Sequence, residues 1–594
     1  MQQLLQDVIA LVAQAGQMIR DEFYRPGGPR GGGDKADIDV EVENFLRAAL
    51  QQRLPGSAVL AEERGHSGDE SAEHTWLVDP HDGTSAFLRG FRGSSVSVAL
   101  LQDNLPVLGV VYAPLYPNDD GDLIAGGPGL GLTRNGQPWN SPWDDAPLGP
   151  QDRVAISQDA DHRSSANIAA LAPARYLAMP SIAYRLALAA TGDARVGGSL
   201  VYLAEHDIGA GHALLLGAGK VLKPWVQNDD SAITYSPRVR SVPMLGGDES
   251  AVDELRSRPA HEILKAPRTS ALSPQPDRRS WREKGLSLSR AQGSLLGQLA
   301  GDALGSLVEF RSASIIAGLY PDGGPDSLHD GGTWDTLAGQ PTDDSEMALK
   351  LARQLIRDGG YLPECVFKAY QNWGNSGPFD IGGTTRRALN GQLDPGSQAN
   401  GSLMRCSPLG LAFSPELLAT IAPNDSALTH PHPLCGECCR LFTQTISRGI
   451  AGMSVEQAVA AALEDSEGEV HELLQQSLEG PPAEYQAQMG WVKIAFRNAF
   501  YLLHQQRPLA EALTWTVRQG GDTDTNAAIA GALLGAFQGE QAVPASWRLA
   551  IVSCRPDQAN RQSRRPRPRD YWPVDALNLA ELLLNLRARD QGSI

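Results

Sequence analysis

The stretch Trp76-Leu77-Val78-Asp79-Pro80-His81-Asp82-Gly83-Thr84-Ser85 is typical of a buried strand that ends in an acidic turn and opens a helix. A second acidic turn, Gly521-Asp522-Thr523-Asp524-Thr525, lies far downstream, and Thr342-Asp343-Asp344-Ser345 has a similar composition. Carboxylate, hydroxyl and carbonyl oxygens are the ligands that Mg²⁺ prefers, and short Asp-rich turns bring several of them together. Acidic turns in opposite halves of the chain therefore predict two catalytic domains, each with its own metal site.

The length and composition agree with a globular protein of two domains. A chain of 594 residues exceeds what one hydrophobic core usually supports. Its net charge of −18 disfavours binding to nucleic acid or to an anionic membrane. Six cysteines form no disulfide framework, no 18-residue apolar span is present, and the first residues read as an amphipathic helix rather than a signal peptide. We therefore expect a cytoplasmic protein with no nucleic-acid or membrane partner.

The pattern along the chain changes near residue 250. Before that point, helical periodicity alternates with strand-like runs such as 95–100 and 107–112, which predicts a layered α/β (α+β) domain over residues 1–250. Residues 251–285 are rich in proline, arginine and serine, and we expect them to form a linker. Ala- and Leu-rich segments with helical periodicity dominate residues 286–594, which predicts an all-α domain.

Two further acids accompany the first acidic turn. Glu62 follows the strand-like run 58–61, and Asp207 stands at the start of an apolar helix. With Asp79-Pro80-His81-Asp82-Gly83-Thr84, these residues resemble the inositol monophosphatase family, which includes the 3′(2′),5′-bisphosphate nucleotidases. The resemblance covers about residues 1–245. It implies a Mg²⁺-dependent phosphomonoesterase whose substrate is a small metabolite such as a nucleotide, an ADP-ribose phosphate or an inositol phosphate.

The same resemblance implies a role for each residue of the motif. The implied Mg²⁺ ligands are the carboxylates of Glu62, Asp79, Asp82 and Asp207 and the backbone carbonyl of His81. Glu62 and Thr84 would orient the attacking water, and the amides of Gly83 and Thr84 would receive the phosphate. Asp39 would lie near a weaker metal site.

Two positions depart from the family pattern, and a simpler interpretation remains. His81 stands where an aliphatic residue is usual, and His206 replaces a tryptophan. The side chains of both histidines are expected to lie near the metals or at the surface rather than to bind the metals, because Mg²⁺ prefers oxygen ligands. The alternative for Asp79 and Asp82 is that they only cap a helix, and a decayed regulatory domain is a second alternative.

The second domain carries a longer series of ordered motifs. Small residues recur along Gly297–Gly305 at a spacing that permits close helix packing, and this helix delivers Glu309 at its end. The blocks that follow the two acidic turns are Asp380-Ile381-Gly382-Gly383-Thr384-Thr385, Asn400-Gly401-Ser402-Leu403-Met404-Arg405, Thr429-His430-Pro431-His432 and Gly490-Trp491-Val492. Together they resemble the ADP-ribosylglycohydrolase family of the dinitrogenase-reductase-activating type, over residues 286–590.

This second resemblance implies a site with two Mg²⁺ ions, with Mn²⁺ as an alternative. The implied metal ligands are Thr342, Asp343, Asp344, Asp522, Asp524 and Thr525. Asp343 or Asp344 would activate a water, and Glu309 would assist it or gate the site. Contacts to ribose and diphosphate are expected from Asp380, Gly382, Asn400, Gly401 and Ser402. The implied reaction is cleavage of the C1″ linkage in ADP-ribosylated protein or in a small ADP-ribose conjugate.

Several alternatives stay open at this stage. His430, His432, Cys435 and Cys438 could suggest zinc, but they lie too close in sequence to wrap one ion. The basic run 564–569 is expected to be a proline-stiffened surface segment rather than a nucleic-acid site. A functional rival is an ADP-ribose sensor in which one domain is non-catalytic or forms a homodimer.

Overall fold

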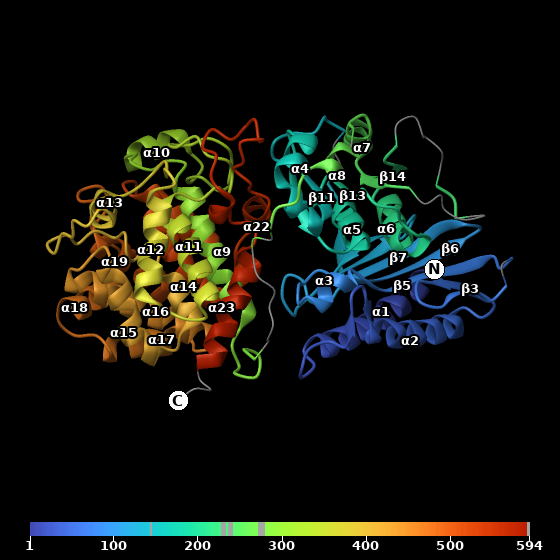
Figure 1. Cartoon of the computed structure of the whole chain (residues 1–594), viewed down its shortest axis with the longest axis horizontal. Coiled ribbons are helices and arrows are strands. Elements are labelled where there is room, and N and C mark those ends of the chain that lie inside the picture. Colours follow the sequence, from blue (N-terminus) through green and yellow to red (C-terminus); the bar gives the residue numbers. More distant parts are fainter. Residues whose placement is uncertain are drawn as a thin grey trace. The chain divides into compact units, whose positions relative to one another are not determined.

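The computed structural model describes residues 1–69, 71–142, 145–226, 233–235, 242–259, 261–270, 272 and 280–590. The chain divides into two compact units, Met1–Asp277 and Arg278–Ile594, which we call the N-terminal and C-terminal units (Figure 1). The N-terminal unit contains both sheets and helices, and the C-terminal unit is almost entirely helical. The predicted fold class, a layered α/β domain followed by an all-α domain, is therefore confirmed.

The N-terminal unit is built on two sheets. The larger sheet has the strand order β10-β9-β8-β7-β6-β5-β3-β4, and the smaller has the order β12-β11-β13-β15-β14. The strands of the larger sheet are β3 (Ala58–Ala61), β4 (Gly65–Ser67), β5 (His74–Asp82), β6 (Ser95–Gln102), β7 (Leu105–Ala113), β8 (Asp122–Gly127), β9 (Gly131–Arg134) and β10 (Gln137–Trp139). Those of the smaller are β11 (Arg153–Ser157), β12 (Arg175–Met179), β13 (Val196–Ser199), β14 (Val221–Pro224) and β15 (Met244–Gly247). A short ribbon, β1 (Gly31–Gly32) with β2 (Lys35–Ala36), precedes them.

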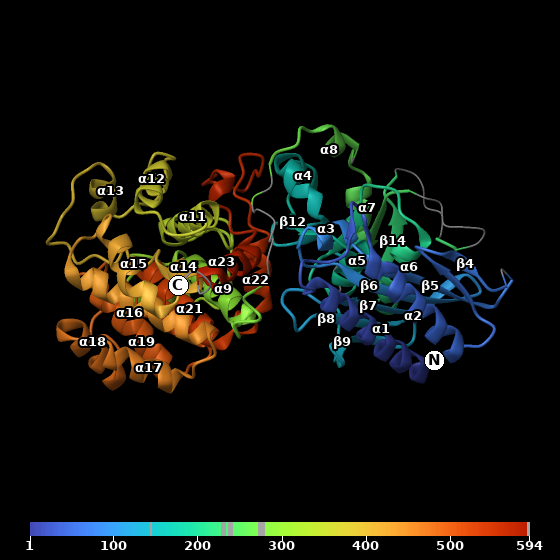
Figure 2. The same cartoon turned by 60° about the horizontal axis from the view of Figure 1, so that its bottom comes forward.

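Helices cover both faces of the larger sheet. The helices of the N-terminal unit are α1 (Gln2–Phe23), α2 (Asp37–Arg53), α3 (Thr84–Leu88), η1 (Gln158–Arg163), α4 (Ser164–Leu171), α5 (Ile182–Thr191), α6 (Glu205–Gly217), α7 (Glu249–Arg256) and α8 (His261–Lys265). Helices α1 and α2 pack on one face, while α5 and α6 lie on the other, between the two sheets (Figures 1 and 2). Strand alternation accounts for this: Trp76 and Val78 join the core under α1 and α2, whereas Leu77 joins the core with α5 and α6.

The segment expected to be a linker, residues 251–285, is folded in its first part. Helix α7 buries Ala251, Val252 and Leu255, because these apolar residues recur on one helical face. Further on, the Thr269 amide donates to the His162 carbonyl at 2.7 Å, which ties this segment to the N-terminal unit. The proline and arginine content of this stretch concealed the short apolar stripe of α7.

The C-terminal unit is a bundle around two central helices, α9 (Leu288–Gly305) and α21 (Thr523–Gln538). The other helices are α10 (Ala313–Leu319), α11 (Asp343–Asp358), α12 (Pro363–Gly374), α13 (Gly383–Leu389), α14 (Ser407–Ala412), α15 (Pro415–Ala427), α16 (Pro433–Ile450), α17 (Val455–Glu464), α18 (Gly468–Glu479), α19 (Val492–His504), α20 (Leu509–Arg518), η2 (Glu540–Ala542), α22 (Ala545–Val552), η3 (Arg569–Tyr571) and α23 (Ala576–Asp590). In the described residues, no helix is both long and apolar enough to cross a bilayer.

A glycine stripe lets α9 and α21 touch along their backbones. A Cβ at Gly297 would lie 2.2 Å from the Gly531 carbonyl oxygen, and one at Gly301 would lie 2.2 Å from that of Ala527. At the end of α9, a Cβ at Gly305 would lie 2.4 Å from the Asp524 backbone nitrogen. Larger side chains would push the helices apart. The stripe therefore fixes the start of α21, where the acids are, against the end of α9.

Candidate metal and catalytic sites

The acids of the N-terminal unit come from neighbouring element ends. Asp79 and Asp82 lie at the end of β5, and Glu62 directly follows β3, which runs parallel to β5. Asp207 stands in the first turn of α6 and accepts a hydrogen bond from the Ala204 amide at 2.6 Å. Since β3 and β5 are parallel, their C-terminal ends lie on the same side of the sheet, and the fold brings the carboxylates that follow them together there.

Burial, and then mutual repulsion, raises the pKa of these carboxyl groups. Asp79 is buried, and burial followed by the charges of Asp82 and Glu62 holds its pKa well above the usual value. The pKa of Asp82 rises to about 6, through burial and the charge of Asp207. The pKa of Asp207 is raised mainly by burial. A group of carboxyls that repel one another in this way is stabilised by a divalent cation.

The N-terminal acids nevertheless stand further apart than those of the C-terminal unit. Among the residues that the structure describes, no three of the N-terminal acids bring carboxylate oxygens within 4.8 Å of one another. Asp82 is held by the Ser181 hydroxyl at 2.7 Å and by the Ala183 amide at 2.8 Å. These contacts join Asp82, at the end of β5, to the start of α5.

His81 and Thr84 belong to one buried network. The Nδ1 of His81 lies 2.8 Å from Oδ1 of Asp39, and its Nε2 lies 3.0 Å from the Ser94 hydroxyl. Because a carboxylate can only accept, Nδ1 carries the proton toward Asp39. The Thr84 hydroxyl contacts the other oxygen of Asp39 at 3.2 Å and the His81 carbonyl at 2.7 Å. The side chain of His81 thus supports Asp39.

The turn between β5 and α3 follows the predicted pattern. Gly83 begins α3 with φ of +96°, a left-handed conformation that favours glycine. The ring nitrogen of His206 lies 3.7 Å from a carboxylate oxygen of Asp207, so His206 stands beside that acid. Burial lowers the pKa of His206.

The C-terminal unit gathers its acids into two overlapping trios. Carboxylate oxygens of Asp302, Asp344 and Asp524 all lie within 4.8 Å of one another, as do those of Glu309, Asp380 and Asp524. Asp524 belongs to both trios, which is the arrangement that two neighbouring cations with one bridging ligand require. Asp302 is a functional candidate that the sequence analysis missed.

Asp302 organises the first acidic turn of this unit. Its carboxylate accepts from the Thr342 amide at 3.1 Å, from the Thr342 hydroxyl at 2.9 Å and from the Ser345 amide at 3.0 Å. These donors are the start of α11, so Asp302 acts as a cap delivered from α9. A signal was present in the sequence: Asp302 is an isolated acid in a helix of small and apolar residues, where an acid is costly unless it is used.

Two further predicted metal ligands, Thr342 and Thr525, contact the same group of acids. Thr342 and Thr525 hydrogen-bond to Asp344 through their side chains. One carboxylate oxygen of Asp344, Oδ1, is buried and has no hydrogen-bond partner in the structure. A buried carboxylate oxygen without a donor fits a cation ligand, because leaving it unpaired is costly.

The predicted substrate contacts divide into two groups. Asn400 donates to Asp522 at 2.7 Å, and the exposed Gly382 donates its amide to Asp343 at 3.3 Å, so both border the acids. Ser402 is fully buried and accepts a hydrogen bond from Ser426. Gly401 packs against the His430 ring, since a Cβ there would lie 2.9 Å from its Cε1.

The acids of the C-terminal unit also raise one another's pKa. The pKa of Glu309 is about 8, through burial and then the charge of Asp380. That of Asp302 is about 6, mainly through burial. Asp343, Asp344 and Asp524 are fully desolvated, and burial holds their pKa well above the usual value. The C-terminal site therefore concentrates acidic side chains that are shielded from water.

The histidines and cysteines considered for zinc have other roles. His432 caps α16 by accepting from the Leu434 amide, and His430 contacts the Thr429 hydroxyl at 2.8 Å. Cys435 directs its thiol to backbone carbonyls of Ser397 and Ala399. In the described part of the chain, the side-chain groups close enough to hold a metal are the two acidic trios alone.

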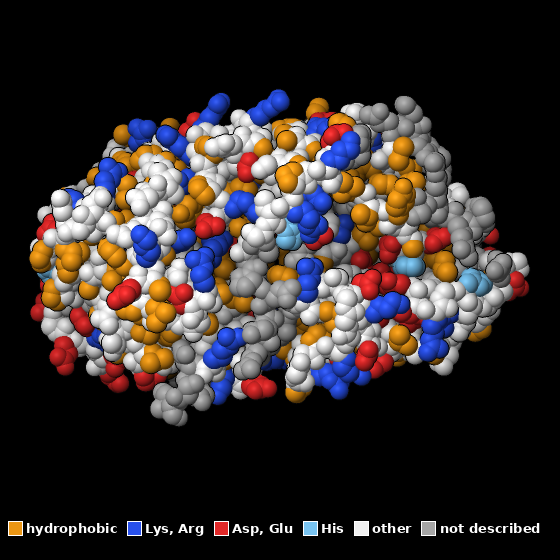
Figure 3. All heavy atoms as spheres, in the orientation of Figure 1, with side chains coloured by type: hydrophobic (Ala, Val, Ile, Leu, Met, Phe, Trp, Pro, Cys, Tyr) orange, Lys and Arg blue, Asp and Glu red, His pale blue; other side chains and the backbone are white. Residues whose placement is uncertain are grey.

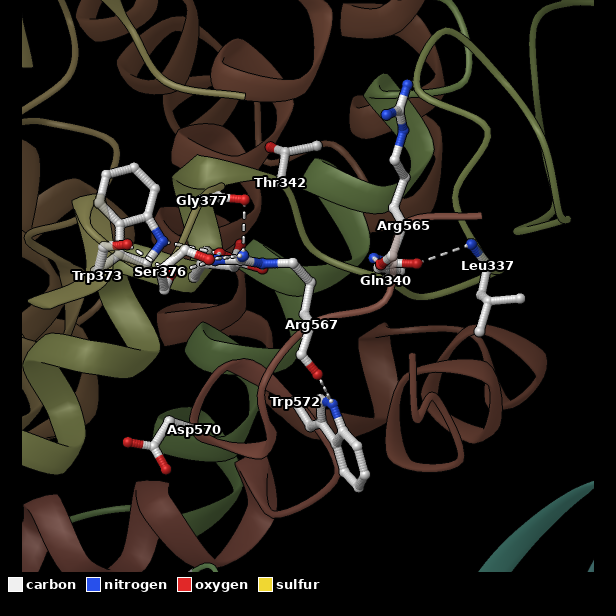
Figure 4. A network of polar contacts seen from close by, with 12 residues as sticks. Leu337, Gln340, Thr342, Trp373, Ser376, Gly377, Arg565, Arg567, Asp570 and Trp572 are labelled. Carbon is white, nitrogen blue, oxygen red and sulfur yellow. Dashed lines mark hydrogen bonds and ion pairs between the residues drawn. The ribbon is translucent and has the colours of Figure 1, made fainter. Parts of the chain in front are cut away.

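The basic run 564–569 differs from the expected surface segment at Arg567. This residue is buried and makes two hydrogen bonds to Glu346, at 2.7 and 2.8 Å. Trp373 donates to the same carboxylate. The Arg567 carbonyl accepts from Trp572 (Figure 4). The run 564–569 is therefore fastened to α11 through Arg567. On the face of the molecule drawn in Figure 3, basic and acidic side chains are interspersed.

Comparison with known proteins follows the same division. The family model for ADP-ribosylglycohydrolase matches residues 284–576, and that for the inositol monophosphatase family matches residues 1–246. An ADP-ribosyl-[dinitrogen reductase] glycohydrolase from Rhodospirillum rubrum is 31% identical over 270 residues, which cover 43% of this chain and 88% of the relative. The ADP-ribosylarginine hydrolase Tri1 of Pseudomonas putida (strain GB-1) is 27% identical over 282 residues, covering 44% and 74%.

The N-terminal unit matches shorter parts of its relatives. Inositol monophosphatase 3 of Solanum lycopersicum is 32% identical over 143 residues, which cover 23% of this chain and 52% of the relative. The chain thus spans about half the length of that protein. Fold, site and comparisons define a hydrolase with two domains. The chain belongs to the ADP-ribosylglycohydrolase family through its C-terminal unit, and its N-terminal unit is similar to the inositol monophosphatase family, whose model it matches.

Proposed function

We propose that the C-terminal unit is a Mg²⁺-dependent ADP-ribosyl hydrolase that cleaves the C1″ linkage of ADP-ribose conjugates. The observation that carries this proposal is the pair of acidic trios sharing Asp524, together with the unpaired buried oxygen of Asp344. Two bound divalent cations would hold the ribose hydroxyls and polarise the C1″ linkage, and Mn²⁺ could replace Mg²⁺. Asp302, Asp344, Asp524 and Asp380 would hold these ions, with Thr342 and Thr525 beside them.

The chain's own residues then supply the proton chemistry. Asp343 accepts the Gly382 amide at the edge of the site and is a candidate, with Asp344, to take a proton from the attacking water. The water oxygen bonds to C1″, the C1″–N or C1″–O bond breaks, and the leaving group gains a proton. Glu309, whose pKa of about 8 keeps it protonated near neutrality, is a suitable donor of that proton. The surrounding carboxylates stabilise positive charge that develops on the ribose.

The substrate we favour is an ADP-ribosylated arginine, in a protein or as a small conjugate. Support comes from the relative named an ADP-ribosylarginine hydrolase and from the dense negative charge of the site, which attracts a guanidinium. Serine-linked, acetyl and phosphate conjugates of ADP-ribose are the other linkages to be tested.

For the N-terminal unit we propose a Mg²⁺-dependent phosphomonoesterase. Its support is the meeting of Glu62, Asp79, Asp82 and Asp207 at one sheet edge, beside the start of α3. Glu62 and Thr84 would orient the water, and the amides of Gly83 and Thr84 would receive the phosphate. Nucleotides, ADP-ribose phosphates and inositol phosphates are the substrate candidates. If a phosphorylated ADP-ribose is cleaved, both units would act on one group of metabolites.

A substrate panel with Mg²⁺ tests both proposals. It compares the wild-type protein with the variants Asp82→Asn and Asp524→Asn. We expect Asp82→Asn to abolish phosphate release and spare release of ADP-ribose, and Asp524→Asn to do the reverse. Tight binding of ADP-ribose without turnover of any conjugate would instead identify the C-terminal unit as a sensor.

A further inference from the structure

A cluster of aromatic side chains borders the second acidic trio. Phe310 directly follows Glu309, and Phe379 directly precedes Asp380. Trp334 lies between them: its ring centroid is 6.3 Å from that of Phe310 and 5.8 Å from that of Phe379. We call these three residues the aromatic wall. Two residues of the wall are thus sequence neighbours of acids in the second trio, Glu309 and Asp380.

One residue of the wall, Phe310, is exposed although it is apolar and has a strained backbone, whereas Trp334 and Phe379 are half-buried. Phe310 is 54% exposed and has φ of +62°, which is unusual for a bulky residue. Its amide donates to the Gly521 carbonyl at 2.9 Å, so the acidic turn before α21 holds this conformation. Strain of this kind persists where the surrounding structure imposes it, commonly at binding sites.

Trp334 connects the wall to the acids. Its indole Nε1 donates to the Glu309 carboxyl at 2.5 Å, and the neighbouring Thr333 hydroxyl donates to the Glu309 carbonyl at 3.0 Å. The indole therefore orients Glu309 while its ring joins Phe310 and Phe379. This combination of ring faces and carboxylates at one place is suited to a planar cation, which stacks on aromatic rings and donates to carboxylates.

We propose that Phe310, Trp334 and Phe379 receive the leaving group of the ADP-ribosyl substrate, and that this group is a guanidinium. The inference rests on the proposed ADP-ribosyl hydrolase activity and names the part of the substrate that the wall recognises. The chain itself provides an example of the contact. The guanidinium of Arg565 lies 6.0 Å from the Phe379 ring centroid, and its Nε donates to the Trp334 carbonyl at 2.9 Å.

Arg565 contacts the wall only through Phe379 and the Trp334 carbonyl in the interactions that the described residues show. Its backbone carbonyl accepts from Gln340 at 2.7 Å, and the adjacent buried Arg567 fixes the segment (Figure 4). The positive charge of Arg565 opposes a second cation, so the substrate guanidinium is placed on the side of Phe310 and Glu309. The carboxylate of Asp380 favours a cation there, and the carboxyl of Glu309, in the same acidic trio, can accept its hydrogen bonds.

The test uses two peptides of the same sequence, one ADP-ribosylated on arginine and the other on serine. For each, kcat/KM is measured with the full-length protein and Mg²⁺. We expect the wild-type protein to prefer the arginine linkage. Phe310→Ala and Phe379→Leu should each lower the arginine-to-serine ratio about tenfold, the effect of losing a partly desolvated cation–π contact. Trp334→Leu should lower both rates, because it also releases Glu309.

Two variants test the physical cause. Arg565→Met should raise the arginine-to-serine ratio about two- to fivefold, because it removes a competing positive charge. The matched control is Leu362→Ala, an equally exposed apolar residue at the start of α12, which should leave the ratio unchanged. Isothermal titration with free ADP-ribose should give Kd values within about threefold for the wild type, Phe310→Ala and Phe379→Leu.

The outcomes separate the inference from the proposed activity. Hydrolysis of neither peptide by the wild-type protein would refute the proposed activity itself. Hydrolysis with an unchanged ratio in Phe310→Ala and Phe379→Leu would refute the wall alone. A tenfold weaker affinity for free ADP-ribose in these variants would also refute it, since the wall would then hold the nucleotide. A preference of the wild type for the serine linkage would overturn the guanidinium assignment.

Discussion

Single buried carboxylates determine the geometry of the C-terminal site, and Asp302 is the clearest case. It forms three hydrogen bonds with the start of α11 and also belongs to the first acidic trio. Its side chain therefore links α9 to α11 at the point where cations would bind. Residues that orient metal ligands in this way usually affect metal affinity nearly as much as the ligands do.

We predict that Asp302→Asn weakens Mg²⁺ binding and lowers release of ADP-ribose by about 10- to 100-fold. The amide would present a donor to groups that are themselves donors, and one negative charge would be lost. Isothermal titration with Mg²⁺ and initial rates are the measurements. Asp322→Asn, an exposed aspartate of the same unit, is the control. Normal Mg²⁺ affinity in Asp302→Asn would show that Asp302 only caps α11.

In the N-terminal unit, His81 is the residue whose role the structure changes most. We predict that His81→Leu destabilises this unit by about 1–3 kcal/mol, because Oδ1 of the buried Asp39 loses its donor. Phosphate release should fall as well, since Asp39 also contacts the Thr84 hydroxyl. Calorimetry and phosphatase rates are compared with those of His66→Leu, which alters an exposed histidine. Unchanged stability would mean that the Asp39 contact contributes nothing.

At the scale of elements, the C-terminal site depends on how closely α9 and α21 approach. The glycines of both helices allow backbone contact, and Asp302 and Asp524 sit near the end of one helix and the start of the other. A small increase in their separation would move these two acids apart. Close packing of this kind has no room for an added methyl group.

We therefore predict that Gly297→Ala destabilises the C-terminal unit by about 1–3 kcal/mol, since the new Cβ would lie 2.2 Å from a backbone oxygen. Chemical denaturation gives the free energy of unfolding. The matched control is Gly318→Ala in α10, where no atom lies within 4 Å and the change should be neutral or stabilising. Equal stability of the two variants would show that the helices can separate at little cost.

At the scale of the whole molecule, each unit gathers mutually repelling carboxyl groups at its proposed cation site. Asp82 and Asp302 have pKa values of about 6, and Glu309 of about 8, above the usual carboxyl values. For each of these groups, the folded protein therefore binds more protons than the unfolded chain at pH values between the unfolded and the folded pKa. Its stability without metal is greatest at low pH in that interval and falls as the pH rises through about 6 to 8.

Divalent cations should reverse this dependence. We predict that Mg²⁺ raises the free energy of unfolding more at pH 8 than at pH 6, because protons compete with it at the lower pH. At a concentration about 100 times Kd, the expected gain is about 2.7 kcal/mol per ion at each site. Denaturation in EDTA and in MgCl₂ at both pH values measures it. An equal gain at pH 6 and pH 8 would contradict the raised pKa values.

The sequence by itself determined the two domains, their fold classes, the two families and the acidic turns that begin α3, α11 and α21. These features are local: a strand pattern, a run of helical periodicity, or several oxygens within a few residues. Only the tertiary structure decided that Asp302 joins Asp344 and Asp524, that His81 supports Asp39, and that Trp334 holds Glu309. Each of these depends on helices or loops meeting across the fold, where glycine contacts and buried hydrogen bonds set the separation, and no local pattern encodes that distance.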